Sequence, residues 1–272
     1  MVGLIDLDSL LYKAVYKIVS INQMREAITK LGKVDAKQWI LEQVYNEGIN
    51  RCENSLLEIQ NYLENIFFEE VTDWQLFITT CTKNFRHNIV KDYKKGRKKN
   101  NYVWLLREHY RNNGAFHADT VEADDLIADR CDALGLGNYI IISPDKDMKT
   151  IGGYYWSYYK QRARDINGDV IRNEYGNYEQ EFKHKLVDFI TKKEAELFFY
   201  SQMLIGDAGD NIKGVKGLGV KRTDRLLKDV NNYFITVARQ YLKRDLKSQF
   251  WQTYRLLKLG TPCKVQLKAL KS

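Results

Sequence analysis

Short apolar runs that end in polar residues alternate with longer amphipathic segments along this chain. Val2–Ile5, Trp74–Thr79 and Tyr139–Ile142 have the length and composition of buried β-strands. Apolar residues at helical spacing predict helices over residues 10–18, 21–68, 102–111, 121–134 and 191–205. Because strands that alternate with helices form parallel sheets covered by helices, we expect an α/β fold with a central, mostly parallel sheet.

The later part of the chain is less regular. The aromatic run Tyr154–Tyr159 fits a β-strand better than a surface that stacks on DNA. Asn167-Gly168 predicts a hairpin turn between short β-prone runs. The C-terminal part looks helical almost to its end. These patterns predict two parts, an α/β core over residues 1–190 and a helical region over residues 191–272.

The basic residues are unevenly placed among the 272 residues, whose formal net charge is +8. Lys and Arg concentrate in residues 83–99, 213–228 and 239–272. One such run is usually a solvated face, but three runs in a chain with acidic clusters favour a polyanionic partner such as nucleic acid. A membrane surface is disfavoured because no apolar helix face accompanies the basic one.

Membrane and secretory signals are missing from the sequence. No apolar stretch approaches the roughly 18 residues of a membrane helix, and no basic leader with an apolar run opens the chain. Cys52, Cys81, Cys131 and Cys263 are far apart, and none lies at zinc spacing with a histidine. We therefore expect reduced thiols and no zinc site. We also expect a cytoplasmic protein, either in a bacterium or, if the protein is viral, in the cytoplasm of its host.

Residues 206–222 combine a carboxylate pair with a glycine-rich cationic turn. Asp207 and Asp210 stand three apart, so on a helical turn both carboxylates would lie on one face and share a hard cation. Glycines and cations follow in the order Lys213, Gly214, Lys216, Gly217, Gly219, Lys221 and Arg222. Glycine permits positive φ and close backbone approach, and a helix-hairpin-helix element grips a phosphate strand in this way. An ordinary loop with solvated charges is the alternative.

Carboxylates also recur at the predicted strand ends and helix starts. With the pair above, the set is Asp6, Glu122, Asp124, Asp125, Asp145, Asp147, Asp207 and Asp210. Acids in the first turn of a helix also complement its dipole, and an Asp-x-Asp after a strand is often a simple turn. However, the loops after parallel strands meet at one sheet edge, where so many carboxylates would repel one another without cations. Because Mg²⁺ prefers such ligands and two ions about 4 Å apart can activate water, we predict metal-assisted phosphodiester hydrolysis.

Five blocks of sequence, in order, resemble the 5′-nuclease superfamily, which comprises flap endonucleases, bacteriophage 5′-3′ exonucleases and the 5′-nuclease domain of bacterial DNA polymerase I. The blocks are Leu4-Ile5-Asp6 with Ser9–Tyr12, Phe85-Arg86-His87 with Tyr93-Lys94 and Arg97, Glu122–Leu126, Ser143–Met148, and residues 206–222. The resemblance implies a PIN-like 5′-nuclease fold with a helical arch over the site, about residues 83–112. It also implies a helix-hairpin-helix element, about residues 206–228.

The same resemblance implies roles for individual residues. The eight carboxylates would bind two Mg²⁺ ions, directly or through water, and Mn²⁺ can substitute. Lys94 and Arg97 would be catalytic residues that contact the scissile phosphate. The DNA-binding residues would be Arg86, Tyr93, Lys213, Lys216, Gly217, Gly219, Lys221 and Arg222. Tyr93 would stack on a terminal base, and the hairpin would hold duplex phosphates or a K⁺ ion.

One position departs from the family pattern. The family usually has an aspartate at the end of the second strand, six residues before the Phe-Arg pair, where this chain has Thr79. Asp8, two residues after Asp6, is expected to point away from the site. We predict reduced metal affinity rather than inactivity. Residues 21–68 and 153–190 are also longer than a compact member of the family needs.

The sequence therefore predicts a structure-specific 5′-3′ exonuclease or flap endonuclease of replication or repair. It would act as a monomer on DNA with a free 5′ end or flap, or on an RNA–DNA hybrid, and replication proteins are possible partners. A non-catalytic or weakly active DNA-binding relative with an impaired metal site is the alternative, although a pure binder of polyanions gains nothing from clustered acids. A nucleotide phosphatase or RNA-processing nuclease is a third hypothesis, which the arch and hairpin blocks disfavour.

Overall fold

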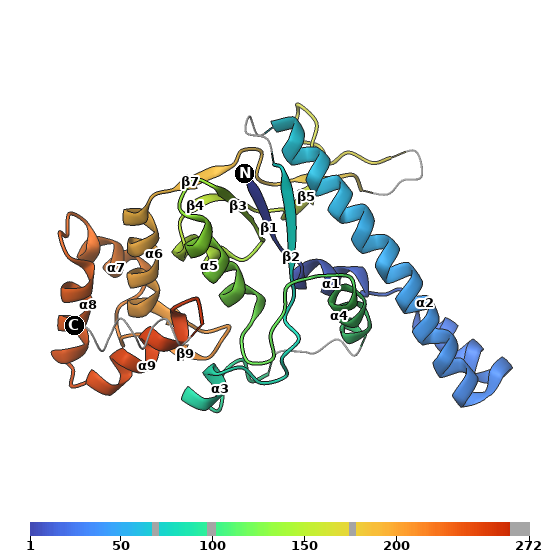
Figure 1. The fold of residues 1–272 in the computed structure, drawn as a ribbon, viewed down its shortest axis with the longest axis horizontal. Helices are drawn as coiled ribbons and strands as arrows, with labels where there is room; N and C mark the ends of the chain where they lie inside the picture. The colour runs from blue at the N-terminus through green and yellow to red at the C-terminus, as the bar shows by residue number, and fades with distance from the viewer. Residues whose placement is uncertain (67–70, 97–101, 174–177, 262–272) are drawn as a thin grey trace.

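A five-stranded sheet, in the order β2-β1-β3-β4-β7, forms the centre of the molecule (Figure 1). The structure is a computed structural model that describes residues 1–66, 71–96, 102–173 and 178–261. The strands are β1 (Val2–Asp6), β2 (Asp73–Phe77), β3 (Tyr139–Ile142), β4 (Gly153–Trp156) and β7 (Asp188–Ile190). The first four run parallel to their neighbours, and β7 pairs antiparallel with β4. The predicted α/β class, with a mostly parallel sheet, is confirmed.

Helices cover both faces of this sheet, which is why β1 and β3 are apolar on both sides. Successive strand residues point to opposite faces. Ile5 and Ile142 pack toward α1, α2 and α4, whereas Leu4 and Ile141 pack toward α5, and all four are fully buried. The helices span α1 (Asp8–Ala14), α2 (Ile21–Ile66), α4 (Val103–Asn112) and α5 (Ala123–Leu134). The carboxyl ends of the parallel strands are thereby left open at one edge.

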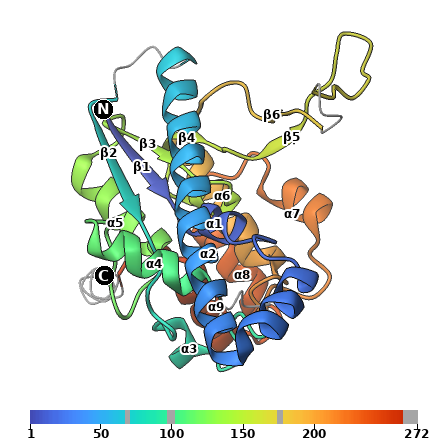
Figure 2. The ribbon, with the colours of Figure 1, turned by 90° about the vertical axis from the view of Figure 1, so that its right-hand side faces the viewer.

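The long helix α2 crosses the sheet and continues beyond it (Figures 1 and 2). It has 46 residues, and Gly32 interrupts its helical path at φ 81° and ψ 166°. Val44, Cys52 and Ile59 are buried against the core, whereas the segment before Gly32 extends away from the sheet. Of the helix predicted over residues 21–68, residues 21–66 are helical, in two segments that meet at Gly32, and residues 67 and 68 lie outside the described residues. None of the helices in the described ranges, α2 included, is long and apolar enough to cross a membrane.

The C-terminal helices pack around an apolar core of their own. Met203, Leu204, Val237 and Tyr241 are buried at its centre. The helices are α6 (Lys192–Ile205), α7 (Val220–Leu227), α8 (Tyr233–Leu242) and α9 (Lys247–Leu257). The predicted helical region is therefore a set of short helices, and its separation from the core at residue 190 stays a prediction.

Shorter elements complete the described chain. They are α3 (Arg86–Ile89), the 3₁₀-helix η1 (Lys146–Thr150), β5 (Lys160–Arg162), β6 (Gln180–Phe182), β8 (Gly206–Asp207) and β9 (Ile212–Lys213). The predicted turn at Asn167-Gly168 is present, because the Gly168 N–H donates to the Asp165 carbonyl and the flanking residues form an antiparallel bridge. Of the predicted aromatic strand, Tyr154–Trp156 belong to β4, with Trp156 only 1% exposed, whereas residues 157–159 follow the strand.

Candidate active site

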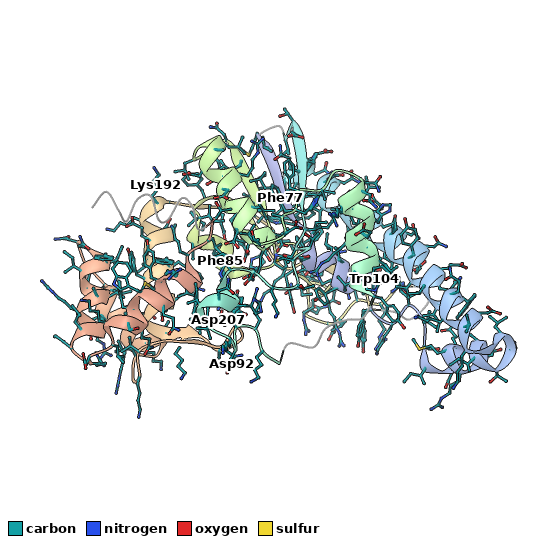
Figure 3. The ribbon with its side chains drawn as sticks, turned by 60° about the horizontal axis from the view of Figure 1, so that its bottom comes forward. Phe77, Phe85, Asp92, Trp104, Lys192 and Asp207 are labelled. Atoms are coloured by element: carbon teal, nitrogen blue, oxygen red, sulfur yellow. The ribbon has the colours of Figure 1, made fainter. Side chains whose placement is uncertain are left out.

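A cavity of about 720 Å³ opens where β1, β2 and β3 end. Parallel strands deliver their carboxyl-terminal residues to the same edge, so the acids that follow them meet there. The wall includes Asp6, Asp8, Thr79, Lys94, Trp104, Arg107, Glu122, Asp124 and Asp145. Figure 3 shows Trp104 toward the α2 side of the molecule and Asp207 toward the C-terminal helices. The acidic site predicted from the strand ends is therefore a real concavity.

Asp6 ends β1 and is 7% exposed. Its Oδ2 accepts a hydrogen bond from the Ser143 hydroxyl at 2.8 Å, and its Oδ1 accepts one from the Asp8 N–H at 3.2 Å. Burial, together with Asp8 and Asp145, raises the pKa of Asp6 to about 7. The carboxylate is held in place but has no cationic partner within the described ranges, and a bound metal ion would relieve this situation.

Asp145 and Asp147 follow β3 and shape the 3₁₀-helix η1. Asp145 accepts a hydrogen bond from the Asp147 N–H at 2.9 Å and so caps the helix. Asp147 accepts one from the Gln202 side chain of α6 at 2.5 Å. Burial, Asp145 and Asp207 raise the pKa of Asp147 to about 6. The turn interpretation of this Asp-x-Asp therefore holds, and the role of both residues as metal ligands stays a prediction.

Glu122 and Asp124 lie at the start of α5. Glu122 forms a capping box with Asp125, and Thr79 adds a further contact because its hydroxyl accepts the Ala123 N–H at 3.0 Å. Burial, Asp125 and Glu122 raise the pKa of Asp124 well above its ordinary value. Burial opposes the charge of Glu122 too, but Lys94 and Arg86 outweigh it, and its pKa is lowered. Glu122 is thus ionised beside a cation, whereas Asp124 makes no ion pair with any residue that the structure describes.

Asp125 and Arg86 form a buried pair, and this corrects both of their predicted roles. Arg86 donates to the two Asp125 oxygens at 2.7 and 2.6 Å, and the two residues are 1% and 0% exposed. The Arg86 Nε also donates to the Leu256 carbonyl at 2.8 Å. A guanidinium enclosed in this way has no surface for DNA, and a carboxylate that is fully buried against it has none for a metal ion. The pair instead ties α3 and α5 to α9.

Lys94 reaches into the acidic cavity. Its Nζ lies 2.5 Å from Glu122 Oε1 and 3.8 Å from Asp210 Oδ2. Burial lowers its pKa, but Glu122, Asp124 and Asp210 outweigh that effect and raise it. Lys94 has φ 53°, and its N–H donates to the Asp210 carbonyl. A cation predicted for the scissile phosphate therefore lies among the predicted metal ligands.

Tyr93 does not present its ring to the cavity, which corrects its predicted stacking on a terminal base. The residue is 5% exposed and packs with the C-terminal apolar core. Its hydroxyl donates to Glu122 at 3.0 Å and to Asp210 at 3.2 Å. Tyr93 therefore joins two acids from distant parts of the chain.

Asp207 and Asp210 lie on a hairpin rather than on the predicted helical turn. Gly206 ends α6 at φ 81°, and Asp207 then pairs with Ile212 in the short β8–β9 ladder. Asp207 Oδ1 accepts the N–H groups of Gly209 and Asp210 at 2.8 and 3.3 Å, which favours a tight turn over a helix. The two acids still reach the site, because Asp207 raises the pKa of Asp147 and Asp210 lies beside Lys94.

The glycine-rich turn after β9 is exposed. An added Cβ at Gly214 would lie 2.3 Å from the Ile205 backbone, so the chain is closely packed against the end of α6. Only Gly217, at φ 85°, uses the positive φ predicted for this segment, and its carbonyl accepts a hydrogen bond from Arg222 at 3.0 Å. The exposed residues are Lys213, Lys216, Gly217, Gly219, Lys221 and Arg222. The cationic hairpin is accessible to a polyanion, although no contact with one is part of the structure.

Asp8 and Arg107 are cavity residues that the sequence interpretation missed. Asp8 was expected to point away, but strand alternation stops at Leu7 and α1 begins at Asp8. Its Oδ1 accepts hydrogen bonds from Arg107 at 2.8 and 3.1 Å and from the Thr79 N–H at 3.3 Å. A carboxylate therefore lies beside Thr79, the position where the family pattern expected one. An arginine on the polar face of a predicted helix was the only signal for Arg107.

The donor set fits hard cations. Burial and repulsion between the acids raise the pKa values of Asp6, Asp124 and Asp147. A divalent ion would stabilise the ionised carboxylates and so oppose both effects. Within the described ranges, no three of these side chains yet converge into a complete ligand set. The residues that could hold metal are Asp6, Glu122, Asp124, Asp145, Asp147, Asp207 and Asp210. Arg97, predicted to act with Lys94, lies outside the described residues.

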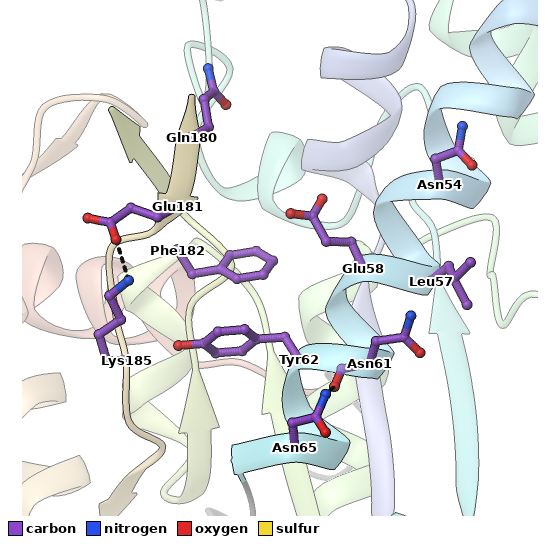
Figure 4. Close-up of a pocket in the computed structure, with 10 residues that line it drawn as sticks. All are labelled: Asn54, Leu57, Glu58, Asn61, Tyr62, Asn65, Gln180, Glu181, Phe182 and Lys185. Atoms are coloured by element: carbon purple, nitrogen blue, oxygen red, sulfur yellow. Dashed lines mark hydrogen bonds and ion pairs between the residues drawn. The ribbon is translucent and has the colours of Figure 1, made fainter. Parts of the chain in front are cut away.

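A second cavity, of about 510 Å³, lies between α2 and β6 (Figure 4). Its wall carries the amides Asn54, Asn61 and Asn65 and the aromatic rings of Tyr62 and Phe182. Its two acids already have cationic partners, since Glu58 pairs with Lys160 and Glu181 pairs with Lys185. We therefore place the candidate site in the first cavity.

Sequence comparison relates the chain to flap endonucleases of Shewanella. It is 30% identical over 212 residues to the flap endonuclease Xni of Shewanella halifaxensis (strain HAW-EB4), a match that covers 69% of this chain and 76% of that protein. It is 30% identical over 179 residues to the flap endonuclease Xni of Shewanella frigidimarina (strain NCIMB 400), which covers 60% of this chain and 59% of the relative. The chain therefore spans less than two thirds of the length of some relatives. No family model matches the chain.

Structural comparison relates the fold to a bacteriophage enzyme. The T5 flap endonuclease, crystallised as a variant in a pseudo-enzyme-product complex with DNA and metal ions, aligns with a TM-score of 0.56. The alignment covers 99% of this chain and 93% of that chain at 15% sequence identity. At this identity the likeness concerns the fold.

Proposed function

The chain belongs to the 5′-nuclease superfamily, and we propose that it is a structure-specific 5′-3′ exonuclease or flap endonuclease that hydrolyses DNA phosphodiester bonds. The relatives named flap endonuclease Xni establish the family, and the T5 flap endonuclease has the same fold. Activity on DNA with a free 5′ end or flap, and on an RNA–DNA hybrid, is part of this proposal.

The observation that carries the proposal is that acids from four separate segments lie in or beside one cavity, two of them next to the cation Lys94. Glu122 from α5 and Asp210 from the β8–β9 hairpin flank Lys94, while Asp6 and Asp145 line the same cavity from the ends of β1 and β3. Acids placed this way repel one another in the metal-free protein, and a bound cation offsets that repulsion. Such a cluster is therefore typical of a cation-dependent site. A binding module for polyanions would gain nothing from them.

Different residues would bind the metal ions, the scissile phosphate and the duplex. Two Mg²⁺ ions held by the acids, for which Mn²⁺ would substitute, supply an activated water and stabilise the leaving oxygen when bound. The Lys94 ammonium would stabilise the negative charge that develops on the scissile phosphate, together with Arg97 as the family resemblance implies. Asp8 would hold Arg107 in position at the cavity wall.

The cationic hairpin would hold the duplex beside the cut. Lys213, Lys216, Lys221 and Arg222 are exposed there, and the turn at Gly217 and Gly219 leaves backbone groups accessible to a phosphate or a K⁺ ion. The hairpin also carries Asp207 and Asp210, so the duplex grip and the acidic cavity are covalently linked over a few residues. This link would set the distance between the held duplex and the cleaved bond.

A labelled 5′-flap duplex tests the proposal. We expect Mg²⁺-dependent release of the flap by the wild-type protein, and no release with a chelator. Asp6→Asn together with Asp145→Asn should abolish cleavage, whereas Asp169→Asn, on the exposed hairpin turn, should leave it unchanged. If the wild-type protein cleaves at no concentration of Mg²⁺ or Mn²⁺, the proposal is wrong.

A weakly active DNA-binding relative is the second candidate, and Thr79 is the observation that favours it. The Thr79 hydroxyl accepts the Ala123 N–H and supplies no negative charge at the end of β2. Flap binding without measurable turnover at saturating Mg²⁺ would identify this alternative.

The proposal places the protein in the cytoplasm. Cys52, Cys81 and Cys131 are free thiols in the described part of the chain, and such thiols fit a reducing compartment.

A further inference from the structure

Helix α4 has one face in the core and the other in the wall of the acidic cavity. Val103, Leu106 and Tyr110 are 2%, 0% and 3% exposed. Trp104, Arg107 and Arg111 stand at helical spacing on the neighbouring face and line the cavity. Along the helix axis this stripe extends about 10 Å, from the tryptophan to the second arginine.

Trp104 is the unusual member of the stripe, because its large side chain is 57% exposed (Figure 3). A single exposed apolar residue on a convex surface needs no explanation. This one borders a cavity whose other walls hold acids and cations, and it has two arginines on its own helix face. An indole beside guanidinium groups fits a ligand that carries both flat rings and phosphates.

The long helix α2 holds α4 in this orientation. An added Cβ at Gly48 would lie 3.0 Å from Leu106, so the absence of a side chain there permits close packing of the two helices. The Tyr110 hydroxyl donates to Glu53 at 2.6 Å, and the Tyr45 hydroxyl lies 2.9 Å from His109 Nδ1. The extra length of residues 21–66 thus positions the wall before any ligand binds.

The two arginines differ in how firmly they are held. Arg107 donates two hydrogen bonds to Asp8 and its side chain is 23% exposed. Arg111 is 46% exposed, and its ion-pair partner among the described residues, Glu108, lies 3.9 Å away. Arg111 is therefore the cation of this face that can turn to a phosphate at little cost.

We propose that this face of α4 binds the unpaired 5′ strand, with Trp104 stacking on a base and Arg111 contacting a phosphate. The inference rests on the proposed function and assigns the stacking role, predicted for Tyr93, to a residue with an accessible ring. Since every base has a π face, the contact tolerates any sequence. It makes Trp104 a determinant of the preference for unpaired over paired 5′ ends.

Equilibrium binding in chelator tests the inference without cleavage. The probes are a 5′-flap duplex with 2-aminopurine in the flap and the matching nicked duplex without a flap. Trp104→Ala should weaken flap binding by about 5- to 150-fold, the range expected for loss of one base–aromatic stack. Trp104→Phe should remain within about threefold of the wild type, because a ring is retained. Binding of the nicked duplex should be unchanged in both variants.

Trp251→Ala is the matched control, since Trp251 is 47% exposed on α9 and does not line the cavity. Its effect on flap binding should be less than about twofold. Arg111→Gln should lower the slope of log K against log salt by about 0.7 for the flap, as expected for loss of one single-strand phosphate contact.

The outcomes separate the inference from the function. Unchanged flap affinity in Trp104→Ala, or an equal loss for flap and nicked duplex, overturns the inference even if the wild-type protein cleaves flaps. Flap binding that depends on Trp104 supports the inference even if cleavage is never observed, in which case the proposed function fails. A Trp104→Ala protein that binds less tightly only because it unfolds would show altered circular dichroism and would also lose the nicked duplex.

Discussion

Two cation–carboxylate contacts at the start of α5 are similar in sequence and different in structure. The side chains of Arg86 and Asp125 are 1% and 0% exposed, whereas those of Lys94 and Glu122 are 21% and 12% exposed and line the cavity. A fully buried charge must keep its partner, because the alternative is an uncompensated charge in the interior. A charge that borders an open cavity can exchange its partner for water, metal or phosphate. The first contact therefore stabilises the fold, and the second remains available for chemistry.

Breaking the buried contact should have the largest effect. Asp125→Asn or Arg86→Met leaves one buried group without its partner, and we expect the free energy of unfolding to fall by about 3–5 kcal/mol. Urea unfolding followed by circular dichroism measures this. Asp119→Asn, an exposed acid, is the control and should change stability by less than about 0.5 kcal/mol. A loss below about 1 kcal/mol for Asp125→Asn would remove the distinction between the two contacts.

Breaking the cavity contact should affect cleavage instead of folding. In saturating Mg²⁺, Lys94→Met should change the free energy of unfolding by no more than about 1 kcal/mol. It should slow single-turnover flap cleavage by about 10²- to 10³-fold, because a positive charge near the scissile phosphate is lost. Lys95→Met is the matched control, since Lys95 is 73% exposed and pairs with Asp92 away from the cavity. Equal losses of binding and cleavage would argue against a catalytic role for Lys94.

The acids of the candidate site also predict a pH dependence for the stability of the metal-free protein. Burial and neighbouring acids raise the pKa of Asp6 to about 7 and that of Asp147 to about 6. Since these folded-state values exceed the unfolded ones, the folded state binds more protons between about pH 4 and 7, and stability falls as the pH rises through that window. From pH 5 to 8 we expect a loss of about 2–4 kcal/mol, at roughly 1.4 kcal/mol per pKa unit.

Thermal or urea unfolding in chelator at the two pH values measures this loss. Asp6→Asn should flatten the profile, and Mg²⁺ should reduce the loss at pH 8 because the ion compensates the ionised acids. Higher stability at pH 8 than at pH 5 in chelator would contradict the expected repulsion.

The smallest expected effect concerns Thr79, which both caps the start of α5 and lines the cavity. Thr79→Val removes the acceptor for the Ala123 N–H and should lower the free energy of unfolding by about 1 kcal/mol. Thr79→Asp keeps an acceptor and adds a carboxylate, so Mg²⁺ affinity measured by calorimetry should rise. Thr79→Asn, similar in shape without the charge, separates the two effects. An unchanged magnesium requirement in Thr79→Asp would show that Asp8 already supplies the needed charge.

The strands were predictable from sequence because a buried parallel strand is apolar on both faces. Tyr139–Ile142 was predicted with the bounds that the structure has, and the acids after β1 and β3 lie where parallel topology places them. The helical turn expected at Asp207 and Asp210 was wrong, because hydrogen bonds from local N–H groups to Asp207 favour a tight turn. Spacing alone cannot distinguish these two conformations, since both bring residues three apart close together.

Individual roles were less predictable than positions. Glu122 and Asp125 lie three residues apart at the start of α5, yet Arg86 pairs closely with Asp125, at 2.6 and 2.7 Å, and only at 3.4 Å with Glu122. That choice depends on the Leu256 carbonyl, which lies 170 residues from Arg86 in the sequence and accepts its Nε–H. Tyr93 was assigned to DNA by motif, but the apolar core of the C-terminal helices buries its ring.

The sequence by itself determined the α/β class, the family, and the presence of acids after β1 and β3 at the open edge of the sheet, because these depend on local periodicity and on the order of motifs. Only the tertiary structure decided which charges are enclosed and which face the cavity. It turned Asp8 toward Thr79 and exposed Trp104 on α4 while burying Arg86 and Asp125. Burial depends on the packing of distant segments, and burial decides whether a charged group serves the fold or remains free for a ligand.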